Sequence, residues 1–145
     1  MIALAADHGG YALKEEVRAW LDENKIAYKD FGSYDGQSCD YPDMAAPACK
    51  AVVSGECDQA LLFCGTGIGI SMAANKIKGI RAACCSDYFS AKYTRLHNNA
   101  NALCMGGRVV GAGLAIELVD AFLHTEFEGG RHQRRIDKIS ALENK

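Results

Sequence analysis

The chain has 145 residues, of which 49% are hydrophobic and 23% charged, and its formal net charge is -2. This length suits one domain with a sizeable core, so we expect residues 1–145 to fold as a single domain. The near-neutral charge gives no reason to expect a nucleic acid or an anionic membrane as a partner, and any anion site must therefore be local.

The seven cysteines form no C-x-x-C pair, and several of them lie in or beside apolar runs, where a thiol acts as a small hydrophobe. This usage indicates a reducing compartment and not a disulfide framework, so we expect a cytoplasmic protein. The first residues, "MIALAADHGG", carry no basic leader and reach Asp7 early, which is unlike a signal peptide or a membrane span.

Short apolar runs and helical periodicities alternate along the chain. The apolar runs predict strands over residues 1–6, 26–31, 59–64, 80–85 and 101–106. The helical spacing predicts helices over residues 11–24, 43–53, 70–77, 87–96, 113–127 and 131–143, although Pro47 weakens the second of them. This alternation predicts an α/β fold, a three-layer αβα sandwich around a five-stranded parallel sheet, for which we expect the strand order 2-1-3-4-5.

Residues with chemically active side chains follow the first and third predicted strands directly. Asp7 and His8 follow the first strand, and the third strand ends at Cys64, before the glycine-rich loop 65–69. In parallel α/β sheets, ligands bind beyond the carboxyl ends of the strands, where the strand order reverses. In the expected order these two strands are neighbours, so an acid, an imidazole and a thiol should share one crevice.

The loop "GTGIG" exposes backbone amides at the start of a helix, where they can hold a phosphate, a carboxylate or a developing oxyanion. A lone G-x-G is more often only a tight turn, and neither a P-loop nor a dinucleotide fingerprint is present. The same amides would stabilise a thiolate at Cys64, although a buried structural cysteine is an equally simple interpretation. A cysteine phosphatase would need an arginine in the loop, and none occurs between Gly65 and Asn75.

His97, in "RLHNNAN", follows the fourth predicted helix and is either a polar turn residue or a site residue. The arginines give a clearer signal. Arg131, Arg134 and Arg135 begin the last predicted helix, where cations are disfavoured unless an anion neutralises them. Arg108 lies at the exit of the fifth strand. Because guanidinium forks match phosphate oxygens, these arginines predict a phosphate-bearing ligand.

Six motifs occur in order along the chain: "AADHGG", "DYPD", "CGTGIG", "HNNAN", "GGRVVG" and "GGRHQRR". Together they resemble the type B ribose-5-phosphate isomerase family, which also contains the galactose-6-phosphate isomerase subunits. The resemblance implies a Rossmann-like sandwich that works as a homodimer, or a higher oligomer, with sites built from both subunits and residues 131–145 packing on the partner. It implies a sugar phosphate as substrate. The chemistry of such an isomerisation requires no metal, so we expect no cofactor and no metal, and we recognise no cluster of metal ligands in the sequence.

The resemblance also implies a role for each site residue in converting ribose 5-phosphate to ribulose 5-phosphate through an enediolate. Cys64 would be the base that moves the proton between carbons 1 and 2, and His97 would open the sugar ring. The reaction also needs donors to the enediolate oxygen, and from its chemistry we expect the Thr66 hydroxyl and the loop amides to supply them. The residues implied to bind substrate are Asp7, His8, Tyr41 and Asn98, and from the chemistry we also expect Gly65, Gly67, Ile68 and Gly69 of the loop to contact it. The residues implied to hold the phosphate are His8, Arg108, Arg131 and Arg135.

Two other functions stay open at this point. One is a different activity of the same family, on a six-carbon sugar phosphate or on a free sugar, with the loop 32–42 shaping that end of the site. The other is a non-catalytic sensor of nucleotides or phosphosugars on the same fold. A sensor would need neither the base nor the ring-opening group, so the pair Cys64 and His97 argues against it.

Overall fold

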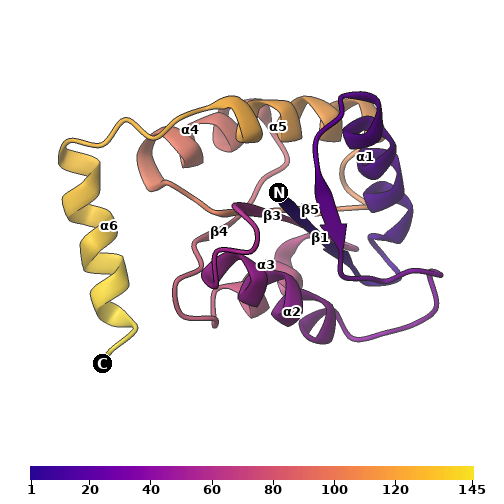
Figure 1. The fold of residues 1–145 in the computed structure, drawn as a ribbon, viewed down its shortest axis with the longest axis horizontal. Helices are drawn as coiled ribbons and strands as arrows, with labels where there is room; N and C mark the ends of the chain where they lie inside the picture. The colour runs from indigo at the N-terminus through magenta and orange to yellow at the C-terminus, as the bar shows by residue number, and fades with distance from the viewer.

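The computed structural model describes all residues, 1–145, as one parallel sheet with helices on both faces (Figure 1). Its strands are β1 (Ile2–Ala6), β2 (Tyr28–Asp30), β3 (Gln59–Cys64), β4 (Ala82–Cys84) and β5 (Ala102–Gly106). Its helices are α1 (Tyr11–Glu23), α2 (Tyr41–Val53), α3 (Ile68–Ala74), α4 (Tyr88–Asn98), α5 (Ala112–His124) and α6 (Arg131–Leu142). The α/β class and every predicted element are confirmed, with ends that differ by a few residues.

The predicted strand order was wrong in its second half. The sheet runs β2-β1-β3-β5-β4, so β5 and not β4 pairs with β3. The physical reason lies in burial: every residue of β5 is buried, whereas the three residues of β4 are half-buried or exposed. A strand inside a parallel sheet is covered on both faces and must be apolar throughout, while an edge strand is not. The short β4, which follows Arg81, therefore lies at the edge.

Two hydrophobic cores fill the spaces above and below the sheet. One lies between the sheet and α1, α4 and α5, and includes Phe63, Phe122 and Leu118. The other lies between the sheet and α2 and α3, and is built largely from small residues such as Ala48, Cys49 and Ala74. Figure 1 shows α2 and α3 on one side of the sheet and the remaining packed helices on the other, which confirms the three layers.

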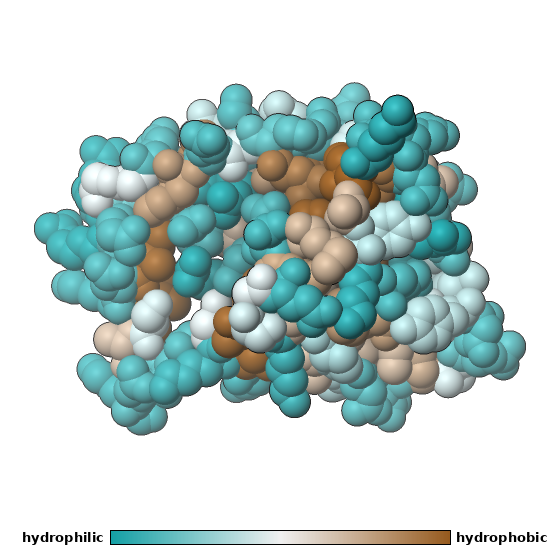
Figure 2. Space-filling view, in the orientation of Figure 1, coloured by the Kyte–Doolittle hydropathy of each residue, from teal (hydrophilic) through white to brown (hydrophobic).

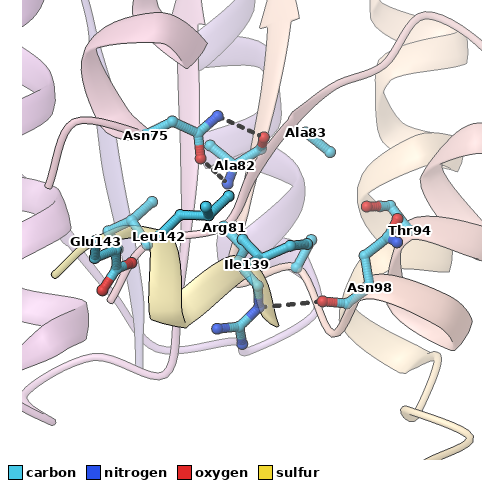
Figure 3. Close-up of a pocket in the computed structure, with 11 residues that line it drawn as sticks. Asn75, Arg81, Ala82, Ala83, Thr94, Asn98, Ile139, Leu142 and Glu143 are labelled. Carbon is cyan, nitrogen blue, oxygen red and sulfur yellow. Dashed lines mark hydrogen bonds between the residues drawn. The ribbon is translucent and has the colours of Figure 1, made fainter. Parts of the chain in front are cut away.

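Helix α6 stands away from this sandwich, at the left of Figure 1. It packs mainly along α4, and its end is held by the side chains of Asn144 and Glu143, which bind Lys78 and the N–H group of Gly79. A groove of about 520 Å³ separates α6 from the body and is lined by Ile139 and Leu142 on the helix side (Figure 3). Figure 2 shows hydrophobic residues along the inner side of α6. No helix has the length and apolar character required to cross a membrane.

Candidate active site

Cys64 is the last residue of β3, and its thiol lies under the loop that follows. The side chain is buried, and its Sγ accepts a hydrogen bond from the backbone N–H of Gly67 at 3.1 Å. This hydrogen bond holds the amide of Gly67 directly against the sulfur. The other buried thiols accept no hydrogen bond from a backbone N–H group. Desolvation raises the pKa of Cys49 to about 11. Desolvation, together with the neighbouring Cys84 and Asp87, raises the pKa of Cys85 to about 12.

The loop can pass over the end of β5 because two glycines meet there. Gly67 has a φ of +81°, and a Cβ on it would lie 2.8 Å from the backbone carbon of Met105. A Cβ on Gly106 would lie 2.5 Å from the backbone carbon of Thr66. Both positions therefore exclude any side chain. The exposed Thr66 uses its Oγ1 to accept the N–H of Ile68 at 3.1 Å, which leaves its own O–H free to donate.

In the sheet, β3 lies between β1 and β5, so residues that follow these two strands border the loop after β3. Cys64 is paired in register with Gly106, so the exit of β5 lies beside the exit of β3. The N–H of Arg108 donates to the carbonyl of Gly65 at 3.0 Å, and its guanidinium lies over the same glycine, where a Cβ would meet Nη1 at 3.3 Å. This guanidinium makes no hydrogen bond or ion pair within the chain, so its donors are available to an anion.

Asp7 and His8 follow β1 on the other side of Cys64, as predicted. The buried carboxylate of Asp7 accepts the N–H groups of Gly9 at 2.9 Å and Gly10 at 3.1 Å through Oδ1, so this oxygen shapes the turn. The Nδ1 atom of His8 accepts the N–H of Cys39 at 3.3 Å. In the neutral ring the proton is therefore on Nε2, which can donate to a ligand.

Tyr41 completes this group from the start of α2. Its ring lies against Gly69, where a Cβ would come within 2.7 Å of the tyrosine Cζ. We call this whole group the strand-exit crevice; it consists of Asp7, His8, Tyr41, Cys64, Gly65, Thr66, Gly67, Ile68, Gly69 and Arg108.

His97 and Asn98 do not lie in the strand-exit crevice of their own chain. They form the last turn of α4, not the loop after it, and the main chain then enters β5 at Ala102. Ala102 pairs with Ala60, at the opposite end of β3 from Cys64. Four residue steps along a parallel strand span roughly 13 Å. Cys64 therefore lies at the carboxyl edge of the sheet, whereas His97 and Asn98 lie near its amino edge.

The arginines of the last helix belong with His97 and not with Cys64. Arg131 and Arg135 are exposed at the start of α6, and their guanidinium groups make no hydrogen bond or ion pair. Helix α6 packs on α4, whose last turn is bound through the carbonyl of Asn98 to Arg81 Nε at 3.1 Å (Figure 3). We call the group His97, Asn98, Glu128, Arg131, His132 and Arg135 the α4–α6 junction.

The junction also contains a group that sequence reasoning missed. The ligand atoms of His97, Glu128 and His132 all lie within 4.8 Å of one another, which corrects the expectation that no cluster of metal ligands exists. The His97 and His132 rings are stacked with centroids 4.2 Å apart. The sequence offers one local signal, a glutamate four residues before a histidine across "GG", but His97 is brought to this pair only by the packing of α6 on α4.

Residues 2–139 match the family model described as ribose/galactose isomerase. The chain belongs to the ribose/galactose isomerase family. A relative in Escherichia coli K12 named ribose-5-phosphate isomerase B is 47% identical over 144 residues, and the match covers 99% of this chain and 97% of the relative. The chain is thus a sugar-phosphate isomerase by family.

Other members of the family agree in fold. The structure of ribose-5-phosphate isomerase B from Clostridium thermocellum matches with a TM-score of 0.97 and 48% identity, covering 99% of this chain and 97% of the other. The Mycoplasma genitalium enzyme, solved with bound ribulose 5-phosphate, matches with a TM-score of 0.93 and 42% identity, covering 99% and 96%. A 40% identical relative from Pectobacterium atrosepticum, covered over 99% of this chain and 95% of its own length, is named D-erythrulose-4-phosphate isomerase.

Within this isomerase family fold, the residues predicted for the site form two groups and not one. The strand-exit crevice holds the thiol, the amide loop and Arg108, and the α4–α6 junction holds His97, Asn98, Arg131 and Arg135. A cavity of about 470 Å³ runs along α4 from Cys84 to Asn98, and His97 and Tyr93 line it. Its Cys84 end reaches the crevice, because Cys84 Sγ lies 3.8 Å from the carbonyl oxygen of Thr66.

Proposed function

We propose that this chain interconverts ribose 5-phosphate and ribulose 5-phosphate, with Cys64 as the base. The observation that supports this most directly is the position of Cys64 at the carboxyl edge of the sheet, where ligands bind, with the N–H of Gly67 donating to its Sγ. The Mycoplasma relative, which binds ribulose 5-phosphate in its structure, supports the choice of substrate.

In the proposed reaction, the Cys64 thiolate removes the proton from carbon 2 of the open-chain aldose. The electron pair of that C–H bond forms a double bond between carbons 1 and 2, and the carbonyl oxygen on carbon 1 becomes an enediolate oxygen. The Thr66 hydroxyl and the free amides of the loop donate to this oxygen, and one such donor can contribute about 2.7–4 kcal/mol. The thiol then returns the proton to carbon 1, and the proton of the hydroxyl on carbon 2 passes to the oxygen on carbon 1. Carbon 2 thus becomes the ketone and carbon 1 carries the new hydroxyl. No step in this scheme uses a metal or a cofactor.

We further propose that two chains share each active site, as in the homodimer that the resemblance implies. Cys64 and His97 lie near opposite edges of one sheet, which supports a site completed by a second chain. The α4–α6 junction of a second chain would supply His97, Asn98, Arg131 and Arg135 to the first chain's crevice. The apolar groove beneath α6, with Leu142 64% exposed, supports an association of this kind.

A turnover screen tests the substrate. The purified enzyme should convert ribose 5-phosphate with a higher kcat/KM than allose 6-phosphate, galactose 6-phosphate, erythrose 4-phosphate or the free sugars. A higher kcat/KM for a six-carbon or a four-carbon sugar phosphate would show that the proposed substrate is wrong, while the isomerase mechanism would stand. In heavy water, solvent deuterium should appear on carbon 1 of the ketose, or on carbon 2 of the aldose in the reverse reaction. Binding of sugar phosphates with no turnover and no exchange would instead support the sensor.

A further inference from the structure

We propose that His97, Glu128 and His132 form a binding site for a divalent transition metal ion of the Zn²⁺ class, and that the bound ion inhibits the isomerase. The inhibitory consequence rests on the proposed role of His97 in ring opening. The binding itself rests only on the geometry of the three side chains.

The separations between the three side chains suit one shared ion. Glu128 Oε2 lies 3.3 Å from His132 Nε2 and 3.8 Å from His97 Nε2. Around a tetrahedral Zn²⁺ with bonds of about 2.0–2.2 Å, neighbouring ligand atoms are roughly 3.4 Å apart. Both measured separations are therefore close to what a common ion requires.

The backbone around the cluster is fixed while the side chains can adjust. The N–H of Glu128 donates to the carbonyl of Leu96 at 3.1 Å, and Arg95 Nε donates to the carbonyl of Thr125 at 3.2 Å. These bonds attach the segment before α6 to the last turn of α4. The His97 and His132 rings are stacked at an angle of 14°, so one ring must rotate before both nitrogens face the same ion. His97 can do so, because its side chain is 39% exposed and makes no hydrogen bond.

The ligand types select the kind of ion. Two imidazoles and one carboxylate are a set that Zn²⁺ accepts with a fourth position left to water. Mg²⁺ and Ca²⁺ prefer six or more oxygens, and the cluster offers one carboxylate. The positive charges of Arg131 and Arg135 on the same helix oppose a cation, so Glu128 is the ligand on which affinity should depend most. Neither of the other two histidines, His8 and His124, belongs to a cluster of three possible ligands, and His124 has only Asp120 beside it.

Metal binding and ring opening would compete for the same imidazole. A neutral imidazole has one nitrogen with a free lone pair, and a metal ion bound there prevents it from accepting a proton. The ion should therefore slow the reaction of substrates that must first open a ring. A four-carbon aldose phosphate cannot close the corresponding furanose ring through its phosphorylated oxygen, so its reaction should be much less affected.

Calorimetric titration with Zn²⁺ tests the site, in the Cys64→Ala background so that this thiol cannot bind the ion. We expect one ion per chain, with affinity at least about tenfold weaker in Glu128→Gln and His132→Gln. The matched controls Glu126→Gln and His124→Gln should bind as the parent does. Glu128 is half exposed, so its substitution should leave the fold intact even if the more buried His132 does not tolerate replacement.

Spectroscopy of bound Co²⁺ tests the ligands, and kinetics with Zn²⁺ test the inhibition. Co²⁺ bound to this site should show visible bands without the thiolate charge-transfer absorption that a cysteine ligand would give. Equal Zn²⁺ affinity in the parent and in Glu128→Gln, or a thiolate band, would overturn the site. The inhibitory part is tested with the enzyme that retains Cys64.

In that enzyme, saturating Zn²⁺ should lower kcat/KM for ribose 5-phosphate by about 100-fold, reversibly on chelation, and much less in Glu128→Gln. Binding without inhibition of ribose 5-phosphate turnover would overturn the inhibitory role. If no sugar phosphate were turned over at all, the proposed function would fail by itself, and calorimetry would still decide the metal site.

Discussion

The strand-exit crevice and the α4–α6 junction hold the two groups of site residues, and they are built in different ways. The crevice lies on buried strand ends: Cys64 and Asp7 are 4% and 7% exposed, and glycines let backbone segments touch. The junction lies on the ends of two helices, and its arginines are exposed and unpaired. A rigid sheet edge suits a base that must be placed accurately against one carbon. Exposed groups at the α4–α6 junction suit contact with a sugar phosphate that is held mainly by the crevice of another chain.

The largest expected effect is the fall in kcat when the base of the crevice is removed. Cys64→Ala should lower kcat by about 10²–10⁴-fold, because no other residue of the loop can accept the proton. Substrate binding should be nearly unchanged when measured by calorimetry. Cys84→Ala, which removes a thiol beside the same loop, is the control and should retain turnover. A folded Cys64→Ala enzyme with near-normal kcat would remove this residue from the mechanism.

The next prediction assigns a separate step to the junction. His97→Asn should lower kcat/KM for ribose 5-phosphate by about 100-fold, because a closed furanose has no carbonyl until a proton moves between the anomeric hydroxyl and the ring oxygen. Erythrose 4-phosphate, if it is accepted, should lose far less. The two kcat/KM ratios give the comparison. A similar loss on both substrates would assign His97 to proton transfer or to the fold.

A smaller effect is expected at the phosphate end of the junction. Arg135→Ala should raise KM for ribose 5-phosphate by about tenfold, because a charge-assisted hydrogen bond contributes about 1.5–3 kcal/mol. A free sugar should not show this change, since it has no phosphate. Arg134→Ala, on the neighbouring position of α6, is the matched control. Equal losses on phosphorylated and free sugars would contradict a phosphate role.

Mixing two inactive variants tests whether crevice and junction come from different chains. In a dimer of Cys64→Ala with His97→Asn, one shared site carries both substitutions and the other carries neither. Random exchange of equal amounts should therefore restore about a quarter of wild-type activity, because half of the dimers are mixed and each has one intact site. Native mass spectrometry would verify the exchange. Exchange without recovery would show that the sites are not shared.

The smallest expected effect is on thermal stability, through the N-terminal cap of α4, the helix that carries His97. Asp87 caps this helix by accepting the N–H of Ser90 at 2.8 Å, and that hydrogen bond lowers the pKa of its carboxyl group. Because the folded-state pKa is depressed, the stabilisation is present above the unfolded pKa and is lost as the pH falls through the folded value. Asp87→Ala should therefore lower Tm slightly at pH 7, and the difference should disappear in acid. A difference that is unchanged in acid would mean that the charge of Asp87 contributes nothing.

The crevice could be predicted from the sequence for a simple reason. Its chemically active residues directly follow apolar runs, and parallel strands place their carboxyl ends at one edge. Asp7, His8 and Cys64 could therefore be grouped from the order of residues alone. The position of Arg108 beside Gly65 could not, because it depends on β5 pairing with β3, and periodicity identifies strands without ordering them. The uniformly apolar character of β5, which suits full burial, was the available signal for that order.

The junction depended on tertiary structure almost entirely. The sequence by itself determined that His97 and a cluster of arginines exist, and that a helix begins at the arginines. Only the packing of α6 on α4 decided that Glu128 and His132 lie beside His97, and only the sheet register decided that this group lies away from Cys64. Contacts between segments far apart in the chain leave no periodic pattern in either segment. The local hydrophobic pattern therefore determines which elements form, and long-range packing determines which side chains meet.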